Sequence, residues 1–177
     1  MNDNDHVVLE RYDPDKTYNK QKRFDCENKI INKFIAGSLK KQVRQNLSQC
    51  FVLLDTSNND RFIGFYTLSS FGIDAFGLEA LSKGSLPSRI PCSRLVMLGV
   101  DKNYKNRGLG KLLMQSVMLK TISAAEQIGI YGLFLDADDG AYTFYIEHGF
   151  IPLQEKIDSK PTPMFLHIDT MRSSLKK

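Results

Sequence analysis

The sequence predicts an α/β domain in which helices flank a mixed central sheet of about six to seven strands. Nearly continuous apolar runs at residues 94–100 and 130–135 are typical of buried strands. A segment of helical periodicity that ends near Gln127 separates them, which predicts a βαβ unit with a right-handed crossover. Two further apolar runs, at 50–54 and 62–68, flank a cluster of turn residues and predict a β-hairpin.

The residues before the hairpin predict one strand and one helical region. The apolar run 7–9 is the expected strand. We expect the helix to begin with Asp25 as its N-cap, because apolar residues recur from Ile31 onward at a spacing of four. Gly37 lies inside this helix and costs about 1 kcal/mol relative to alanine, so a break into two short helices is the alternative.

The remaining segments complete the predicted sheet. Residues 72–90, which contain glycine and proline, predict a long loop with one helical turn. After the second buried strand we expect a short helix at about 139–148, and apolar segments at 150–153 and 164–169 that close the sheet. No repeat or linker divides the chain, so residues 1–177 are expected to form a single domain.

Composition narrows the class of protein. Hydrophobic residues make up 42% of the chain and charged residues 25%, which is average for a globular protein and excludes wholesale disorder. No apolar run approaches the roughly 18 residues of a membrane span, and the first residues are polar, so neither a membrane segment nor a signal peptide is expected. The three cysteines lack C-x-x-C spacing, which favours free thiols in a cytoplasmic protein without a metal site. A net charge of +4 permits an anionic partner without requiring one.

The loop between the first buried strand and the long helix is the clearest candidate binding site. N–H groups at a helix start attract anions, and glycine lets the backbone approach a ligand closely. This loop carries one acidic residue, Asp101, against four basic ones, which are Lys102, Lys105, Arg107 and Lys111. The pattern fits a diphosphate. The alternative is an ordinary turn in which Gly108 and Gly110 are needed only for positive φ or for tight packing.

The residues after Gly110 argue against two other phosphate-binding motifs. The dinucleotide pattern G-x-G-x-x-G fails because Leu113 stands where its last glycine would be. The NTPase pattern G-x-x-x-x-G-K-[ST] fails because Leu112 follows Lys111. Neither a nicotinamide enzyme nor an NTPase is therefore favoured.

Two segments resemble signature motifs of the GNAT family of N-acetyltransferases. Residues 98–113 are similar to the acetyl-coenzyme A motif of the family, R/Q-x-x-G-x-G/A between a buried strand and a helix. Residues 141–150 are similar to its block A-x-x-F-Y-x-x-x-G-F. The resemblance covers residues 90–155 and implies the GNAT fold, with transfer of an acetyl group from acetyl-coenzyme A (acetyl-CoA) to a primary amine.

The segment that starts at Phe24 and includes Phe34 is similar to the start of one GNAT subgroup, F-x-C-G-x-x-x-L-x-x-F-L. That subgroup contains the toxins of bacterial toxin–antitoxin pairs, which acetylate the free amine of aminoacyl-tRNA. Two residues depart from the patterns. Lys105 stands where the family has Arg or Gln, which keeps a charge but lacks the forked guanidinium, and Glu27 stands where the subgroup has glycine.

The resemblance implies three roles for residues of this chain. The pyrophosphate is bound by backbone amides of Lys105, Asn106, Arg107, Gly108, Leu109, Gly110 and Lys111. The pantetheine arm pairs with the strand that ends at Leu98 and Val100, where a backbone N–H can polarise the thioester carbonyl. Tyr145 is the expected proton donor to the departing thiolate, because a phenol of pKa about 10 is protonated at neutral pH. Tyr142 is the second candidate, and the alternative for Tyr145 is a half-buried tyrosine with a satisfied hydroxyl.

The sequence leaves the substrate and the partners open. Aminoacyl-tRNA is the favoured substrate, and a ribbon-helix-helix antitoxin and a second copy of the chain are the expected protein partners. The alternatives are a small amine, a peptide or a protein lysine as substrate, or a regulatory module that binds coenzyme A without catalysis. A general base, if one acts, would be Asp136, Glu147 or His148.

Basic residues around the first helical region are candidates for contact with RNA phosphates, although such charges usually form only a solvated helix face. They are Lys20, Lys22, Arg23, Lys40, Lys41 and Arg44.

Overall fold

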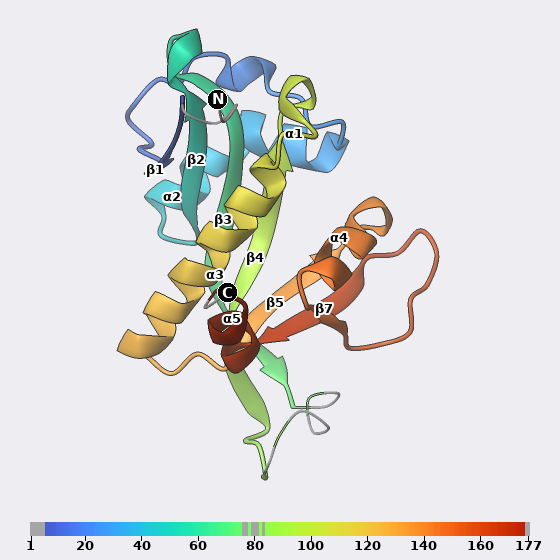
Figure 1. Ribbon diagram of the computed structural model, residues 1–177. Helices are drawn as coiled ribbons and strands as arrows, with labels where there is room; N and C mark the ends of the chain where they lie inside the picture. The colour runs from blue at the N-terminus through green and yellow to red at the C-terminus, as the bar shows by residue number, and fades with distance from the viewer. Residues whose placement is uncertain (1–5, 76–77, 79–81, 83, 176–177) are drawn as a thin grey trace. The chain divides into compact units, whose positions relative to one another are not determined.

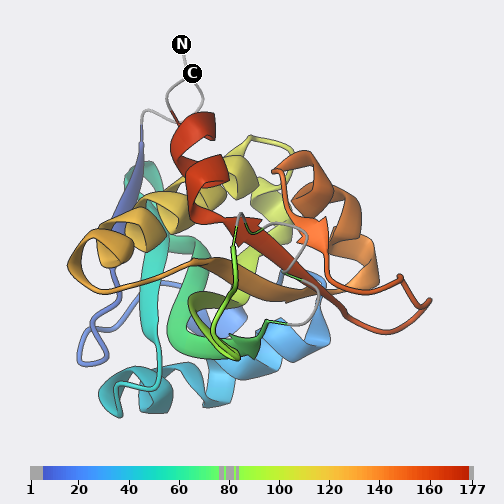
Figure 2. The ribbon, with the colours of Figure 1, turned by 90° about the horizontal axis from the view of Figure 1, so that it is seen from below.

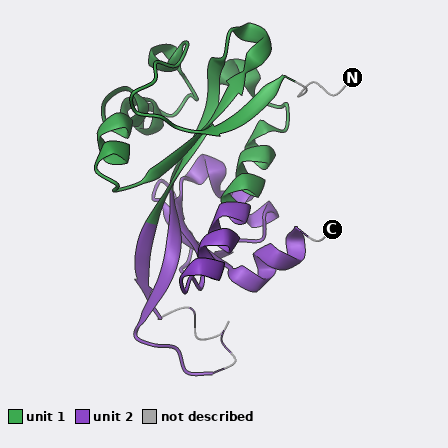
Figure 3. Ribbon diagram, turned by 90° about the vertical axis from the view of Figure 1, so that its left-hand side faces the viewer, with its two compact units in different colours: residues 1–69, 96–117 green, residues 70–95, 118–177 purple. Residues whose placement is uncertain are grey.

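The computed structural model describes residues 6–75, 78, 82 and 84–175, and Figure 1 shows the chain coloured from its N-terminus to its C-terminus. The chain forms two compact units, which Figure 3 distinguishes by colour. The first unit comprises residues 1–69 and 96–117, and the second comprises residues 70–95 and 118–177. That residues 1–177 act as a single domain stays a prediction.

In the described part of the chain, seven strands form one sheet in the order β1-β2-β3-β4-β5-β7-β6. The strands are Val7–Arg11 (β1), Gln49–Asp55 (β2), Arg61–Asp74 (β3), Arg89–Val100 (β4), Gly132–Ala137 (β5), Ile151–Pro152 (β6) and Thr162–His167 (β7). β4 and β5 run parallel, whereas β1–β2, β2–β3, β5–β7 and β6–β7 are antiparallel. The predicted α/β class with a mixed sheet is confirmed. The predicted hairpin is β2–β3, and the predicted βαβ unit is β4, the helix Leu109–Gln127 (α3) and β5.

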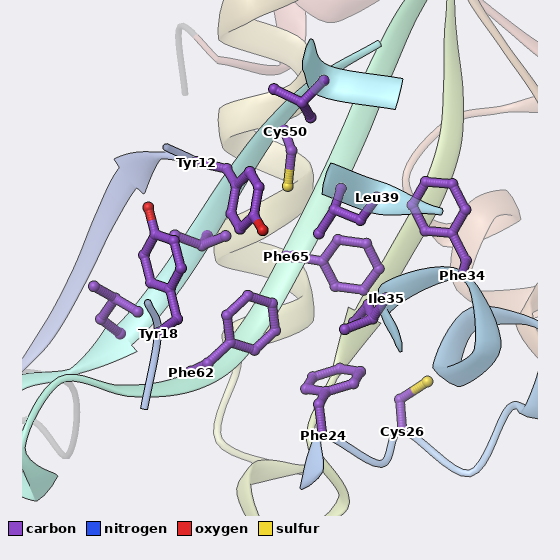
Figure 4. Packing of buried hydrophobic residues seen from close by; sticks show 13 residues of the cluster. Tyr12, Tyr18, Phe24, Cys26, Phe34, Ile35, Leu39, Cys50, Phe62 and Phe65 are labelled. Atoms are coloured by element: carbon purple, nitrogen blue, oxygen red, sulfur yellow. The ribbon is translucent and has the colours of Figure 1, made fainter. Parts of the chain in front are cut away.

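The core of the first unit is formed by side chains from the segment between β1 and the first α-helix, from the first two α-helices, and from β2 and β3 (Figure 4). Aromatic rings meet edge to face within it. The Phe24 ring centroid lies 5.3 Å from that of Phe62 and 5.7 Å from that of Phe65. Such contacts add about 0.5–1.5 kcal/mol per pair beyond the burial of apolar area.

The first helical region begins and breaks at particular residues. The helix Lys29–Gly37 (α1) has Asn28 as its N-cap, whose side-chain oxygen accepts hydrogen bonds from the backbone of Ile30 and Ile31 at 3.0 and 3.2 Å. The prediction of Asp25 as the N-cap is therefore wrong. The Asp25 carboxylate instead organises the turn before the helix, since it accepts a bond from the Glu27 N–H at 2.9 Å. A second helix, Leu39–Arg44 (α2), follows, so the predicted alternative of a break is confirmed.

The core of the second unit contains Ile73 and Ile90, two residues for which the sequence predicted a loop. The predicted loop 72–90 is wrong at both ends, because β3 continues to Asp74 and β4 begins at Arg89. The glycines and the proline of this segment obscured the strand pattern. The helical turn expected there falls in a stretch of which residues 76–77, 79–81 and 83 lie outside the described residues.

The C-terminal elements include one helix that the sequence analysis missed. The predicted strand 164–169 ends at His167, and the helix Ile168–Ser174 (α5) follows directly (Figure 2). The imidazole of His167 caps this helix by accepting the backbone N–H of Asp169 at 3.2 Å. The predicted helix 139–148 is present as a 3₁₀ turn, Asp139–Ala141, and the helix Tyr142–Glu147 (α4).

Two further predictions concern the cysteines and the membrane. Cys26, Cys50 and Cys92 are free thiols, as expected, and all three are buried. Among the described helices, none combines the length and the hydropathy that a membrane span requires.

We predict that Gly132→Ala lowers the free energy of unfolding by about 3 kcal/mol, because a Cβ at this position would lie 2.3 Å from Cζ of Phe165 and 2.5 Å from the carbonyl oxygen of Leu166. Urea denaturation measures the change. Gly37→Ala is the matched control: its Cβ would meet nothing within 4 Å, and alanine in α1 should stabilise the protein by about 0.5–1 kcal/mol. Wild-type stability in Gly132→Ala would contradict this packing.

Candidate functional site

The loop that follows β4 is fixed at its base by Asp101. Its backbone N–H donates to the carbonyl of Ile63 in β3 at 2.8 Å. Its carboxylate is only 2% exposed and accepts bonds from the backbone and side-chain nitrogens of Asn103 at 3.0 and 2.9 Å. A guanidinium nitrogen of Arg61 lies 3.7 Å from the same carboxylate. A buried charge needs such partners. Asp101 therefore stabilises the loop, and its carboxylate is not on the loop surface where an anion would bind.

Tyr104 holds the middle of the loop, a role that the sequence analysis missed. Its buried hydroxyl donates to Oδ2 of Asp55 at 2.7 Å and accepts from Asn58 at 3.2 Å. The guanidinium groups of Arg61 and Arg107 lie 5.3 and 4.8 Å from its ring centroid. Burial and the bond to Asp55 raise the pKa of Tyr104. The one signal in the sequence was an aromatic residue inside an otherwise polar turn.

The end of the loop presents backbone N–H groups at the start of α3. Asn106 and Gly108 adopt left-handed conformations, with φ of 61° and 76°. The Leu112 N–H donates to the Gly108 carbonyl at 3.0 Å. The preceding N–H groups of a helix have no intrahelical acceptor, and no acidic side chain stands in the first turn of α3. This end of the helix is therefore suited to an anion.

Two ion pairs join this loop to the turn before α1. Lys102 donates its backbone N–H to the Asp25 carbonyl at 2.8 Å, and its ammonium lies 2.9 Å from the Asp25 carboxylate. Hydrogen bonds from Lys102, Glu27 and Asn32 lower the pKa of Asp25 to about 2. The ammonium of Lys105 contacts the carboxylate of Glu27. The two residues that depart from the family and subgroup patterns thus contact each other.

Within the first unit, β4 is the last strand of the order β1-β2-β3-β4. Leu98 and Val100 are half-buried and share one face of this strand. On the other face, Gly99 fits closely: a Cβ there would lie 3.3 Å from side-chain carbons of Ile31 and Phe65. The prediction that this strand is buried on both faces is wrong at its C-terminal end, where one face remains accessible.

Tyr145 lies on α4 in the second unit and is 8% exposed. Its ring makes edge contacts with Phe144 and Phe150, at centroid distances of 5.3 and 5.5 Å. Burial, with Asp138 nearby, raises the pKa of Tyr145, so that its hydroxyl stays protonated at neutral pH. Of the residues that the structure describes, none forms a hydrogen bond to this hydroxyl. Tyr145 is thus a protonated phenol whose ring packs against two phenylalanine rings.

Two of the three candidate bases are engaged by other groups. Asp136 accepts a hydrogen bond from Arg94 at 2.8 Å, and Arg94 also lies over the Phe71 ring at 4.8 Å. The Nδ1 atom of His148 lies 2.6 Å from the Phe144 carbonyl oxygen. These contacts do not favour either residue as a base; Glu147 is exposed. In the described residues, no group of three or more His, Cys, Asp or Glu side chains could hold a metal ion.

A family model described as "Acetyltransferase (GNAT) domain" matches residues 46–152. The chain therefore belongs to the GNAT acetyltransferase family, which confirms the resemblance. GNAT enzymes use acetyl-CoA, so the predicted enzyme class and cosubstrate are confirmed at the level of the family.

Curated relatives are more specific. The chain is 31% identical over 107 residues to a tRNA-acetylating toxin of Mycobacterium tuberculosis, a match that covers 60% of this chain and spans 63% of that protein. It is 27% identical over 176 residues to a probable toxin TacT of Sinorhizobium fredii, a match that covers 94% and 93% of the two chains.

Solved structures give the same similarity in three dimensions. A bacterial toxin of 34% identity aligns with a TM-score of 0.91 and covers 96% of this chain and 95% of its own. The AtaT toxin complexed with acetyl-methionyl-tRNAfMet, at 27% identity, has a TM-score of 0.83 and covers 96% and 99%. A tyrosine-to-phenylalanine mutant of AtaT, bound to acetyl-CoA and to the C-terminus of the antitoxin AtaR, has 25% identity and a TM-score of 0.80, and covers 98% and 100%.

We predict that Tyr104→Phe lowers the free energy of unfolding by about 1–3 kcal/mol, because it leaves the buried Asp55 carboxylate without one of its donors. Chemical denaturation at pH 7 provides the measurement. Asn58→Ala is the control, since it removes an exposed donor to the same hydroxyl and should cost less than about 0.5 kcal/mol. Equal losses in the two variants would exclude this role for Tyr104.

Proposed function

We propose that this chain transfers the acetyl group of acetyl-CoA to the amino group of aminoacyl-tRNA and acts as the toxin of a type II toxin–antitoxin pair. The observation that carries the proposal is the similarity, over 96% of this chain, to AtaT complexed with acetyl-methionyl-tRNAfMet. The similarity to a curated tRNA-acetylating toxin also supports it.

In this proposal the diphosphate of acetyl-CoA binds at the start of α3. The residues assigned to it by their backbone amides are Lys105, Asn106, Arg107, Gly108, Leu109, Gly110 and Lys111. The left-handed Gly108, the exposed cations of the loop and a first helical turn without acidic residues all suit an anion. The pantetheine arm extends along the C-terminal end of β4, beyond Ser93 and Arg94 where this strand pairs with β5, and backbone groups at Leu98 and Val100 pair with the arm.

The transfer requires one bond to form and one to break. The neutral amine attacks the thioester carbonyl carbon, and a backbone N–H of β4 stabilises the oxyanion that results. The C–S bond then breaks and the thiolate takes the proton of the Tyr145 hydroxyl. The proton that the amine loses passes to solvent, and solvent returns a proton to the Tyr145 phenolate. An α-amino group in an aminoacyl ester is less basic than a lysine side chain, so the reaction does not depend on a strong base in the protein.

Charge on the first unit favours contact with an RNA backbone. The basic residues Lys20, Lys22, Arg23, Lys40, Lys41 and Arg44 are all exposed. Of these, Arg44 is engaged with Asp15. Phosphate contacts of this kind position a nucleic acid without reading its sequence. An antitoxin of ribbon-helix-helix type and a second copy of the chain complete the proposed set of partners. The complex of AtaT with the C-terminus of AtaR supports the antitoxin as a partner.

We expect the purified protein to N-acetylate aminoacyl-tRNA when it is incubated with acetyl-CoA and total aminoacyl-tRNA. Mass spectrometry of the amino acids released by ester hydrolysis identifies the product and the amino acid. Free amino acids and deacylated tRNA are the controls. If free amino acids are acetylated and aminoacyl-tRNA is not, the protein is a small-amine acetyltransferase and the toxin assignment is wrong.

We expect Tyr145→Phe to lower kcat by about 10²–10⁴-fold and to leave the Kd for acetyl-CoA within about twofold, because only the proton donor is lost and the ring contacts remain. Steady-state kinetics and calorimetry separate the two effects. Tyr142→Phe should retain most of the activity. Expression of the wild type should arrest bacterial growth, whereas Tyr145→Phe should not. Full activity of Tyr145→Phe would remove Tyr145 from the mechanism.

A further inference from the structure

Glu27 stands in a conformation that is unusual for its residue type. Its φ is 67°, in the left-handed region that favours glycine. The surrounding contacts fix this conformation: Glu27 donates its N–H to Asp25 at 2.9 Å, and Cys26 donates its N–H to Asn32 at 3.0 Å. The backbone conformation of this turn is therefore one that glycine adopts most easily. The side chain of Glu27 makes no contribution to these backbone hydrogen bonds.

The added side chain ends at the proposed diphosphate site. The carboxylate of Glu27 contacts the ammonium of Lys105, the first residue of the proposed diphosphate-binding segment 105–111. The side chains of the two residues are 61% and 41% exposed, so solvent and other ions reach the pair. An exposed ion pair is weak and exchanges readily with a competing anion.

We propose that the Glu27 carboxylate competes with the diphosphate of the cosubstrate for Lys105. The proposal rests on the function proposed above, because it assigns a regulatory contact to the same binding site. Glu27 thereby weakens the binding of acetyl-CoA and of the coenzyme A product alike, since both carry the same diphosphate. It favours release of the product, a step that limits the turnover of many enzymes.

Other contacts of the loop are consistent with this role. The second carboxylate of the turn, Asp25, is held by Lys102 and by Asn32 and belongs to the framework of the turn. Glu27, by contrast, accepts only from Lys105 among the described residues. Its charge can therefore be removed without disturbing the framework.

The test is a set of calorimetric titrations of acetyl-CoA into the wild type, Glu27→Gln, Lys105→Gln and the double variant. Glutamine keeps the size of the side chain and removes its charge. We expect Glu27→Gln to lower the Kd about threefold to tenfold, and this gain to disappear when Lys105 is also replaced. Glu10→Gln is the matched control: it removes the carboxylate of another exposed pair, 2.7 Å from Lys16, and should leave the Kd unchanged.

Two further measurements locate the effect on the diphosphate. Coenzyme A and 3′-dephospho-coenzyme A both retain the diphosphate. Glu27→Gln should therefore lower the Kd of each by the same factor as the Kd of acetyl-CoA. The difference from the wild type should shrink as NaCl rises from about 50 to about 300 mM, because salt screens exposed charges. A gain restricted to ligands that carry the 3′-phosphate would overturn the proposal.

The outcomes separate this inference from the proposed function. If the wild type binds acetyl-CoA and Glu27→Gln binds it equally well or more weakly, the inference is overturned and the cosubstrate site stands. The inference also fails if the gain persists in the Lys105→Gln background. If neither the wild type nor any folded variant binds acetyl-CoA, the cosubstrate site itself is wrong and the inference falls with it. Thermal denaturation verifies that each variant is folded.

Discussion

The backbone N–H groups at the start of α3, which have no acceptor within the helix, impose the strictest demand on the surrounding residues. A helix start that receives an anion cannot be capped by its own chain, yet it has to be held in place. Contacts with the rest of the first unit hold the helix start in place. Asp101 and Tyr104 fix the loop through β3 and β2, and the buried side chains of Leu109 and Leu113 anchor the first turns of the helix. Their contacts leave the outward-facing amides available.

The parts of the fold that the sequence predicted well are those encoded by local patterns. The unit β4–α3–β5 follows from two apolar runs and one helical period. Competing local signals caused the errors. Asp25 and Asn28 are both good N-cap residues, and only the bonds to Ile30 and Ile31 decide between them. The apolar pattern of β7 continues into Ile168, which concealed the start of α5.

Contacts between distant segments account for what the sequence analysis missed in the candidate site. Tyr104 owes its role to Asp55 at the end of β2, far from it in the sequence, and no pattern around either residue indicates their hydrogen bond. Asp136 looked like a candidate base because it ends a strand, but Arg94 on the neighbouring strand engages its carboxylate. The motif around Tyr145 specified a residue and a helix. The edge contacts of its ring with Phe144 and Phe150, and the burial that raises its pKa further, emerge only from the structure.

Lys105 and Glu27, taken separately, are two departures from the patterns of related sequences, and each would weaken the assignment. Their contact gives them a common explanation. A lysine at the first position of the motif is a compact cation that one carboxylate can neutralise, whereas a glutamine there would offer no charge to compete for. The left-handed backbone at Glu27 is held by the hydrogen bonds of the turn, from the Glu27 N–H to Asp25 and from the Cys26 N–H to Asn32. The two substitutions are best understood as one change in the electrostatics of the cosubstrate site. The backbone at Glu27 keeps the left-handed conformation that favours glycine.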